Sequence, residues 1–219
     1  SQYTQESSQV QLMSFLKATY QLFAGSLLAA TAGAYIGLGI VSILMGPMKW
    51  VLFAVELALI FFVIPRVKHT PGVNLAVLFA FTFITGLTIA PLLSSIFAMA
   101  DGAAIVGQAF LMTSVAFGAI SMFAMTTKRD FSSMGKFLFI ALIIMIVAGI
   151  SNIFIQSSMM QLAIASVGAL LFSAFILYDT QNIIKGAYDS PIEAALALYL
   201  DFFNLFISLL QILGIMNSG

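Results

Sequence analysis

The sequence predicts an all-α integral membrane protein with seven transmembrane helices. Hydrophobic residues occupy 62% of its 219 positions and charged residues only 7%, and a soluble domain of this size could not bury so much apolar surface. The charged residues are gathered between long apolar runs, so they mark the segments that lie in water. These segments are all shorter than about twenty residues, which excludes a soluble catalytic domain.

The apolar runs define the spans in chain order. Because about 20 residues cross a bilayer as a helix, the runs over 73–127 and 137–184 must each hold two spans. The first run is divided by "AMADGA" around Asp101 and the second by the polar "QSSMMQ" at 156–161. The predicted spans are therefore residues 22–44, residues 50–65, the two halves of 73–127, the two halves of 137–184, and residues 193–215.

The second predicted span is unusually short, and the first contains a pattern of small residues. The second span is short and only just crosses the hydrocarbon core at about 1.5 Å per residue, so we expect Lys49 and Arg66 to extend toward water at its ends. In the first span, Gly33 and Gly37 of "GAYIG" form a small-residue pattern that is typical of close helix packing.

The basic residues orient the spans. With seven spans, the N-terminal arm and the even-numbered loops lie on one side, and the opposite side has only Lys49. The positive-inside rule makes the richer side cytoplasmic, with a polar cytoplasmic arm over residues 1–16 and a single seven-helix domain over 17–219. The basic residues on the predicted cytoplasmic side are Lys17, Arg66, Lys68, Lys128, Arg129, Lys136 and Lys185.

Composition excludes several classes of function. The eight basic and eight acidic residues give a net charge of zero, and no basic stripe exists to bind nucleic acid. The absence of cysteine excludes disulfides, thiolate metal sites and cysteine nucleophiles. We expect no cofactor.

Three carboxylates lie inside predicted spans: Glu56, Asp179 and Asp201. A charge in mid-bilayer costs roughly 3 kcal/mol, so such residues are usually functional. Asp179 and Asp201 each lie eleven residues from Ser190, the midpoint of the short loop between the last two spans. In an antiparallel helix pair the two aspartates therefore share one depth, about 10 Å below the cytoplasmic interface.

Two carboxylates at one depth in lipid have few other partners, so we expect them to meet and to share one proton. Gain of a second proton or loss of the first would break this contact, which makes it a pH-sensitive latch between two helices. When ionised, the same oxygens suit Ca²⁺ bound transiently, with Asn182 and Asn204 as further oxygen donors. The sign of the pH response stays open. Asn152 either bonds between helices or lines an ion pathway.

Four segments carry a family resemblance. They are "TGLTIAPLLSS" from Thr85, "DFSSMGKFL" from Asp130, "ILYDTQNII" from Ile176 and "LYLDFFNLFISLLQILG" from Leu198. In this order they resemble the characteristic segments of the Bax inhibitor family, also called the transmembrane Bax-inhibitor-motif proteins. The chain's compactness resembles the bacterial members.

The resemblance implies a fold whose last helix is central and surrounded by the other six, in a bacterial inner membrane with the N-terminus in the cytoplasm. It implies a pH-sensitive calcium leak channel controlled by Asp179 and Asp201, with Ca²⁺ and H⁺ as the transported and sensed ions and the lipid bilayer as environment. Glu56 matches the family's second-helix carboxylate. Arg66 corresponds to its basic residue near the aspartates, although Pro65 directly before Arg66 departs from the family pattern.

Two other functions compete with the channel. The resemblance also implies a regulatory protein that binds a membrane-anchored protease or another membrane partner without conducting ions. An intramembrane aspartyl protease would need Gly-x-Gly-Asp on the second helix, where this chain has bulky residues from Leu198 to Leu200 before Asp201. We therefore expect no enzyme activity.

Overall fold

The structure is a computed structural model that describes residues 2–219, with side chains from residue 3 onward. It is 86% helical and has no strand within that range, and seven of its described helices are long and apolar enough to cross a membrane. The predicted all-α membrane class is confirmed. The elements are α1 Gln2–Leu38, α2 Val41–Leu44, α3 Met48–Ala58, the π-helical η1 Leu59–Val63, α4 Ile64–Val67, α5 Val73–Phe97, α6 Gly102–Thr126, the 3-10 helix η2 Ser132–Met134, α7 Gly135–Ile155, α8 Ser158–Ile184 and α9 Pro191–Met216.

The chain forms two compact units. The first comprises Ser1–Ala98 and Gly186–Tyr199, and the second comprises Met99–Lys185 and Leu200–Gly219. The division falls within α9, whose first turns belong to one unit and whose remaining turns belong to the other. The central place of the last helix, and one domain over 17–219, stay predictions.

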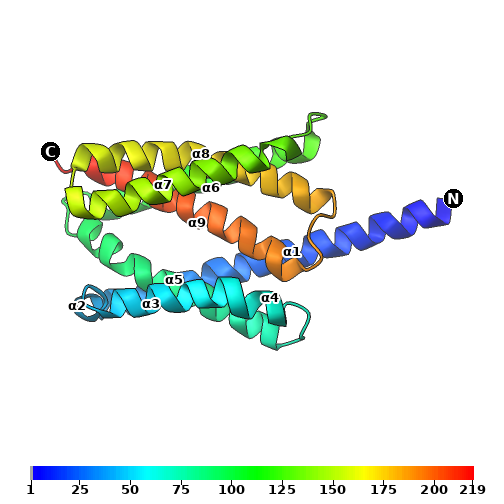
Figure 1. The fold of residues 1–219 in the computed structure, drawn as a ribbon, viewed down its shortest axis with the longest axis horizontal. Coiled ribbons are helices and arrows are strands. Elements are labelled where there is room, and N and C mark those ends of the chain that lie inside the picture. The colour runs from blue at the N-terminus through cyan, green and yellow to red at the C-terminus, as the bar shows by residue number, and fades with distance from the viewer. Residues whose placement is uncertain (1) are drawn as a thin grey trace. The chain divides into compact units, whose positions relative to one another are not determined.

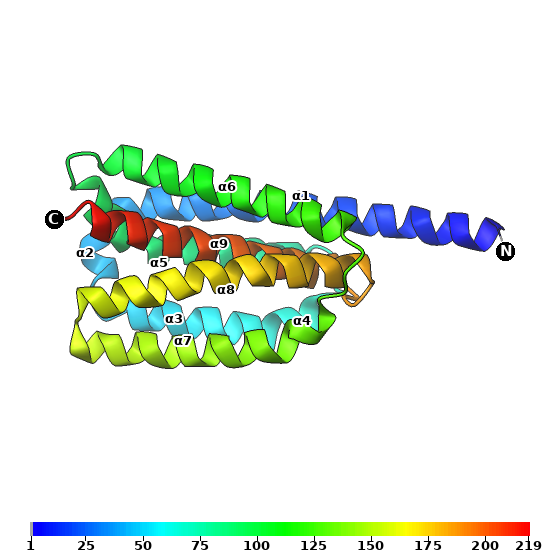
Figure 2. The same ribbon diagram turned by 90° about the horizontal axis from the view of Figure 1, so that it is seen from above.

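In the first unit α1 packs along α5, and α2, α3 and α4 also contact α5 (Figure 1). The side chains of Leu78, Phe81 and Ala90 of α5 are fully buried or nearly so, which makes α5 the core helix of this unit. The N-terminal turns of α1 project beyond α4 and α5 in both ribbon views (Figures 1 and 2). Every residue from Tyr3 to Gln11 is exposed.

The second span is one continuous helical stretch, Met48–Val67, that includes a π-helical segment. Pro65 lacks a backbone N–H and its ring crowds the carbonyl of Phe61 four residues earlier. The widened turns of η1, Leu59–Val63, lie directly before it. Local changes of this kind let a membrane helix tolerate proline, and they explain why this span continues two residues beyond the predicted end at 65.

In the second unit α8 packs against both α6 and α7 (Figure 2). Phe202 of α9 makes edge-to-face contacts with Phe110 and Phe117 of α6, with ring centroids 5.9 and 5.5 Å apart. Gly168 of α8 allows a second close contact, because a Cβ there would lie 2.7 Å from the hydroxyl oxygen of Ser208 on α9. These contacts join α6, α8 and the later turns of α9.

The predicted breaks between spans are confirmed. Asp101 directly precedes α6, and α7 ends where Gln156 adopts a left-handed φ of 54°. Ser157 then caps α8 by accepting a hydrogen bond of 3.2 Å from the Met160 amide.

The first span differs from its predicted bounds of 22–44. The helix ends at Leu38, before Gly39, and residues 41–44 form the separate α2. It also begins at Gln2, so the described part of the predicted arm is helical, and Ser1 lies outside the described residues. The chain has no proline and no glycine between Gln2 and Ala24, and nothing in that stretch interrupts the backbone hydrogen bonds.

Candidate functional site

Asp179 of α8 and Asp201 of α9 lie in the second unit, 8% and 4% exposed. Their carboxyl groups interact through a hydrogen bond. The second oxygen of Asp201, Oδ2, is buried and has no hydrogen-bond partner in the described part of the chain. The structure therefore brings together the two carboxylates that the loop length placed at one depth, and their gating role stays a prediction.

The turn that carries Asp179 is also hydrogen-bonded to the loop between α6 and η2. Gln181 is buried, donates through Nε2 to the Arg129 carbonyl at 2.9 Å, and accepts through Oε1 from the Phe131 amide at 2.9 Å. One amide side chain thus satisfies two backbone groups of the segment between α6 and η2. Sequence reasoning missed Gln181, although its place two residues after Asp179 within an apolar helix was a signal.

Glu56 of α3 lies in the first unit and is half-buried. Its Oε1 accepts a hydrogen bond of 3.0 Å from the Thr88 hydroxyl of α5. Thr88 also lines a cavity of about 340 Å³ together with Lys49 and Pro91. The Thr88 hydroxyl thus joins Glu56 to the wall of a cavity that Lys49 also lines.

Arg66 of α4 is exposed, and its guanidinium is bonded to its own helix. It donates to the Phe62 carbonyl and lies over the Phe62 ring at 6.0 Å from the centroid. The carbonyl it serves lies in the π-helical segment before Pro65, where the helical hydrogen-bond pattern is altered. This contact gives Arg66 a local role in the helix.

The three asparagines have different surroundings. Asn152 is buried and donates to Gln161 at 3.1 Å, and Gln161 donates to Gln211 at 3.1 Å, so an amide chain joins α7, α8 and α9. Asn204 donates to the Leu200 carbonyl of its own helix at 2.8 Å. Asn182 is half-buried in the last turn of α8. The sequence-predicted bond of Asn152 between helices is present, and the two glutamines that extend it were missed.

Two carboxylates supply too few ligands for a resident metal ion. No group of three or more His, Cys, Asp or Glu side chains that could hold a metal occurs among residues 2–219. Calcium takes six to eight oxygen ligands. Transient binding of Ca²⁺ by Asp179 and Asp201 stays a prediction.

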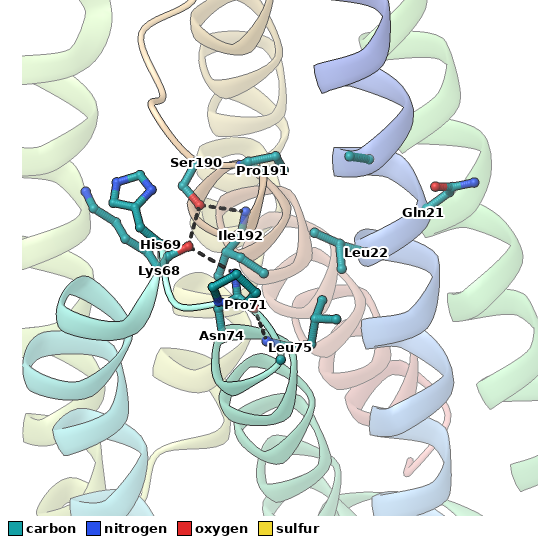
Figure 3. A pocket seen from close by; sticks show the side chains of 12 residues that line it. Gln21, Leu22, Lys68, His69, Pro71, Asn74, Leu75, Ser190, Pro191 and Ile192 are labelled. Atoms are coloured by element: carbon teal, nitrogen blue, oxygen red, sulfur yellow. Dashed lines mark hydrogen bonds between the residues drawn. The ribbon is translucent and has the colours of Figure 1, made fainter.

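A second polar cluster lies in the first unit at the start of α9. Lys68 Nζ contacts both carboxylate oxygens of Glu193 at 3.1 Å and Oδ1 of Asp189 at 3.2 Å, and His69 lies 3.4 Å from Asp189. Figure 3 shows the Lys68 carbonyl between Ser190 and Asn74, which donate to it at 3.3 and 3.1 Å. The cluster joins the loop after α4 to the loop before α9.

These contacts shift the ionisation of the cluster. The hydrogen bonds to Glu193, and then to Asp189, raise the pKa of Lys68 above its ordinary value. The bond to Lys68 is the largest cause that lowers the pKa of Asp189. In the second unit, Lys185 and the Ser132 amide lower the pKa of Asp130 well below its ordinary value. Sequence reasoning missed that Lys68 pairs with residues more than a hundred positions away.

Comparison with known proteins places these residues in a family. The family model described as inhibitor of apoptosis-promoting Bax1 matches residues 12–218. An uncharacterized protein of Campylobacter jejuni is 54% identical over 211 residues, which cover 95% of this chain and 91% of that protein. An uncharacterized protein of Helicobacter pylori is 51% identical over 208 residues, covering 95% of this chain and 89% of that protein.

The chain belongs to the Bax inhibitor family. An uncharacterized membrane protein of Vibrio cholerae is also similar, at 40% identity over 206 residues that cover 93% of this chain and 90% of that protein. As a Bax inhibitor family member with seven apolar helices, the chain is a multi-pass membrane protein. The matched range covers most of both units and includes Glu56, Asp179 and Asp201.

Proposed function

We propose that this Bax inhibitor family member is a pH-sensitive calcium leak channel of the bacterial inner membrane, with its N-terminus in the cytoplasm. The contact between Asp179 and Asp201 is its gate. The observation that carries the proposal is this buried carboxyl–carboxyl hydrogen bond between α8 and α9. Two carboxyl groups can bond in this way only when at least one proton is present. The contact therefore depends on pH by its chemistry.

The latch acts by joining two helices. With one proton shared, the pair holds α8 to α9, and loss of that proton leaves two repelling carboxylates in a low-dielectric site. Separation of the helices at this level would expose oxygen ligands to a cation. The unpartnered Oδ2 of Asp201 is one such ligand, and the Asp179 carboxylate supplies others.

Glu56 is proposed as a third carboxylate on the ion pathway, after Asp179 and Asp201. It is half-buried, it is held by Thr88, and Thr88 lines the cavity beside it. A carboxylate and a hydroxyl are hard oxygen ligands that suit Ca²⁺ during passage. Arg66, Asn152, Asn182 and Asn204 are proposed as residues that shape this pathway or the latch.

The test is calcium flux into proteoliposomes between about pH 5.5 and 8.5, the range in which protein carboxylates with altered surroundings change charge. Asp179→Asn and Asp201→Asn keep the size of the side chain and remove its ionisation. We expect each to change flux at least about five-fold at one end of the range and to flatten the pH profile. Asp101→Asn is the matched control, because Asp101 is exposed and lies between spans. Wild-type flux and pH profile in both latch variants would refute the proposal.

A second function is supported by the N-terminal turns of α1. Tyr3, Val10 and Met13 are 89%, 65% and 65% exposed on a helix that projects beyond the rest of its unit. A helix with exposed apolar residues offers a docking face to a partner such as a membrane-anchored protease. Removal of residues 1–16 should abolish capture of such a protease while leaving calcium flux intact. Loss of flux together with binding would argue against two separate roles.

A further inference from the structure

A cavity of about 540 Å³ lies at the start of α7, in the second unit, and plays no part in the proposed channel. Its lining combines one lysine, two serines, one tyrosine, one glycine and one phenylalanine. The lining residues are Ser132, Ser133, Gly135, Lys136, Phe139 and Tyr178.

Lys136 brings to this cavity a positive charge that no carboxylate of the described chain pairs with. Its side chain takes part in none of the ion pairs formed within residues 2–219. The cavity beside α1 and α9 differs in this respect, because its lysine, Lys68, is bonded to two carboxylates. A lysine without a carboxylate at a cavity wall attracts an anionic ligand.

The nearest acidic residue along the chain is already engaged. Asp130 pairs with Lys185 and accepts hydrogen bonds from the amide and the hydroxyl of Ser132. Its charge is therefore balanced by Lys185. Lys136, together with the neighbouring Lys128 and Arg129, leaves this end of the unit positive.

The remaining donors converge on the same space. Ser133 and Tyr178 form no hydrogen bond through their hydroxyl groups within the described chain, and both line the cavity with Lys136. Gly135 permits this arrangement, because a Cβ there would lie 2.5 Å from the Tyr178 hydroxyl oxygen. A lysine and two hydroxyls around one space are a donor set suited to phosphate oxygens.

The residues that follow turn an apolar surface outward. Phe137, Phe139 and Ile140 are 71%, 60% and 57% exposed, and they begin the span Ser132–Ile155. The donors thus lie at the end of a transmembrane segment, at the level of lipid headgroups, with an apolar helix face beneath them. A ligand that fits both parts has an anionic head and a hydrocarbon tail.

We propose that this cavity binds the headgroup phosphate of an anionic phospholipid, with an acyl chain along the exposed face of α7. Lys136 forms the charge-assisted bond to the phosphate, and Ser133 and Tyr178 donate to its remaining oxygens. The headgroup of phosphatidylcholine also carries a phosphate, but its cationic group is repelled by Lys136 and the adjacent basic residues. The site therefore prefers phosphatidylglycerol, and basic pockets at the cytoplasmic ends of transmembrane helices recognise anionic headgroups in this way.

The test titrates phosphatidylglycerol, phosphatidylcholine and inorganic phosphate separately into the detergent-purified full chain, with thermal shift and native mass spectrometry as readouts. We expect Lys136→Gln to weaken phosphatidylglycerol binding roughly five-fold. Lys128→Gln removes the same charge from an exposed neighbour outside the cavity and should change binding less than about two-fold. Tyr178→Phe removes only the hydroxyl and should weaken binding about two- to five-fold, the value of one hydrogen bond.

Three outcomes would overturn the proposal. Equal loss in Lys136→Gln and Lys128→Gln would mean that general surface charge attracts the lipid. Equal affinity of the wild type for phosphatidylcholine would remove the anionic selectivity. Inorganic phosphate that stabilises the wild type as much as phosphatidylglycerol does would assign the site to a free anion. Should Lys136→Gln fail to fold, Tyr178→Phe alone must still lower the affinity for phosphatidylglycerol.

Discussion

Gly33 of α1 and Gly86 of α5 form a reciprocal backbone contact. A Cβ on Gly33 would lie 2.0 Å from the Phe83 carbonyl oxygen, and a Cβ on Gly86 would lie 2.0 Å from the Ala30 carbonyl oxygen. Each glycine thus faces a carbonyl three residues before the other. Helices that approach this closely gain dispersion contacts and Cα–H···O contacts, which replace the hydrophobic driving force that is missing between helices in lipid.

Gly33→Ala should therefore destabilise the first unit. The atom that a new Cβ meets belongs to the backbone of α5 and cannot rotate away, so the two helices must separate. We expect a loss of about 1–3 kcal/mol in the free energy of unfolding, measured in detergent by thermal or denaturant unfolding. Gly86→Ala should act in the same way.

The chain offers a matched control for these variants. A Cβ on Gly118 of α6 would have no heavy atom of another part of the chain within 4 Å, so Gly118→Ala adds a methyl group to open space. That change should be neutral or slightly stabilising, because alanine favours the helix. Equal losses at Gly33 and Gly118 would show that helix contact is not the cause.

Gln181→Leu should release the segment between α6 and η2. The leucine keeps the size of the side chain but leaves the Arg129 carbonyl and the Phe131 amide without their partner. We expect a loss of about 1–3 kcal/mol in stability and faster trypsin cleavage after Lys128 or Arg129. Cleavage at the wild-type rate, with stability unchanged, would mean that other contacts hold this loop.

The Lys68 cluster should stabilise the protein over a defined pH range. The pKa of Lys68 is raised, so its contribution is fully present below the unfolded value of about 10.4 and is lost as the pH rises through the folded value. The pKa of Asp189 is lowered, so its contribution is present above about 3.9 and is lost as the pH falls through the folded value. Both contributions hold between about pH 5 and 9.

Lys68→Gln should accordingly lower the melting temperature by about 1–2 °C between these limits and by less at either extreme. The difference should also shrink in high salt, because the cluster is partly exposed. Lys128→Gln, in an exposed loop, is the control. A melting-temperature difference that widens below about pH 4 would contradict the assigned directions of the pKa shifts.

The depth of the two aspartates could be predicted from the sequence, whereas the contacts between residues far apart in the chain could not. The equal spacing of Asp179 and Asp201 from Ser190 indicated a shared depth before any coordinates, because helix rise and a short loop fix that depth. The rotation of α8 and α9 about their axes does not follow from spacing, so the facing of the two side chains needed the structure. The pairing of Lys68 with Glu193 could not be predicted, because 125 residues separate them and no motif in either segment indicates the other as a partner.

The first span shows the same division within one helix. Apolar composition identified a span but misplaced its ends, because hydropathy does not record where backbone hydrogen bonds continue into a polar segment such as Gln2–Gln11 or stop before Gly39. The small-residue pattern at Gly33 and Gly37 predicted close packing without a partner. The partner, α5 with Gly86 and Ala90, came only from the fold.

By itself the sequence determined that this protein lies in a lipid bilayer, how many spans it has, and that spans break at Asp101 and Gln156. It also identified the intramembrane carboxylates that need an explanation. These properties depend on transfer free energies and helix rise, which are local and additive along the chain. Only the tertiary structure decided which side chains meet across helices, where the cavities lie, and that Lys136 lines a cavity without joining an ion pair of the described chain. Those properties depend on helix rotation and packing, and packing is fixed by the shapes of all contacting side chains together.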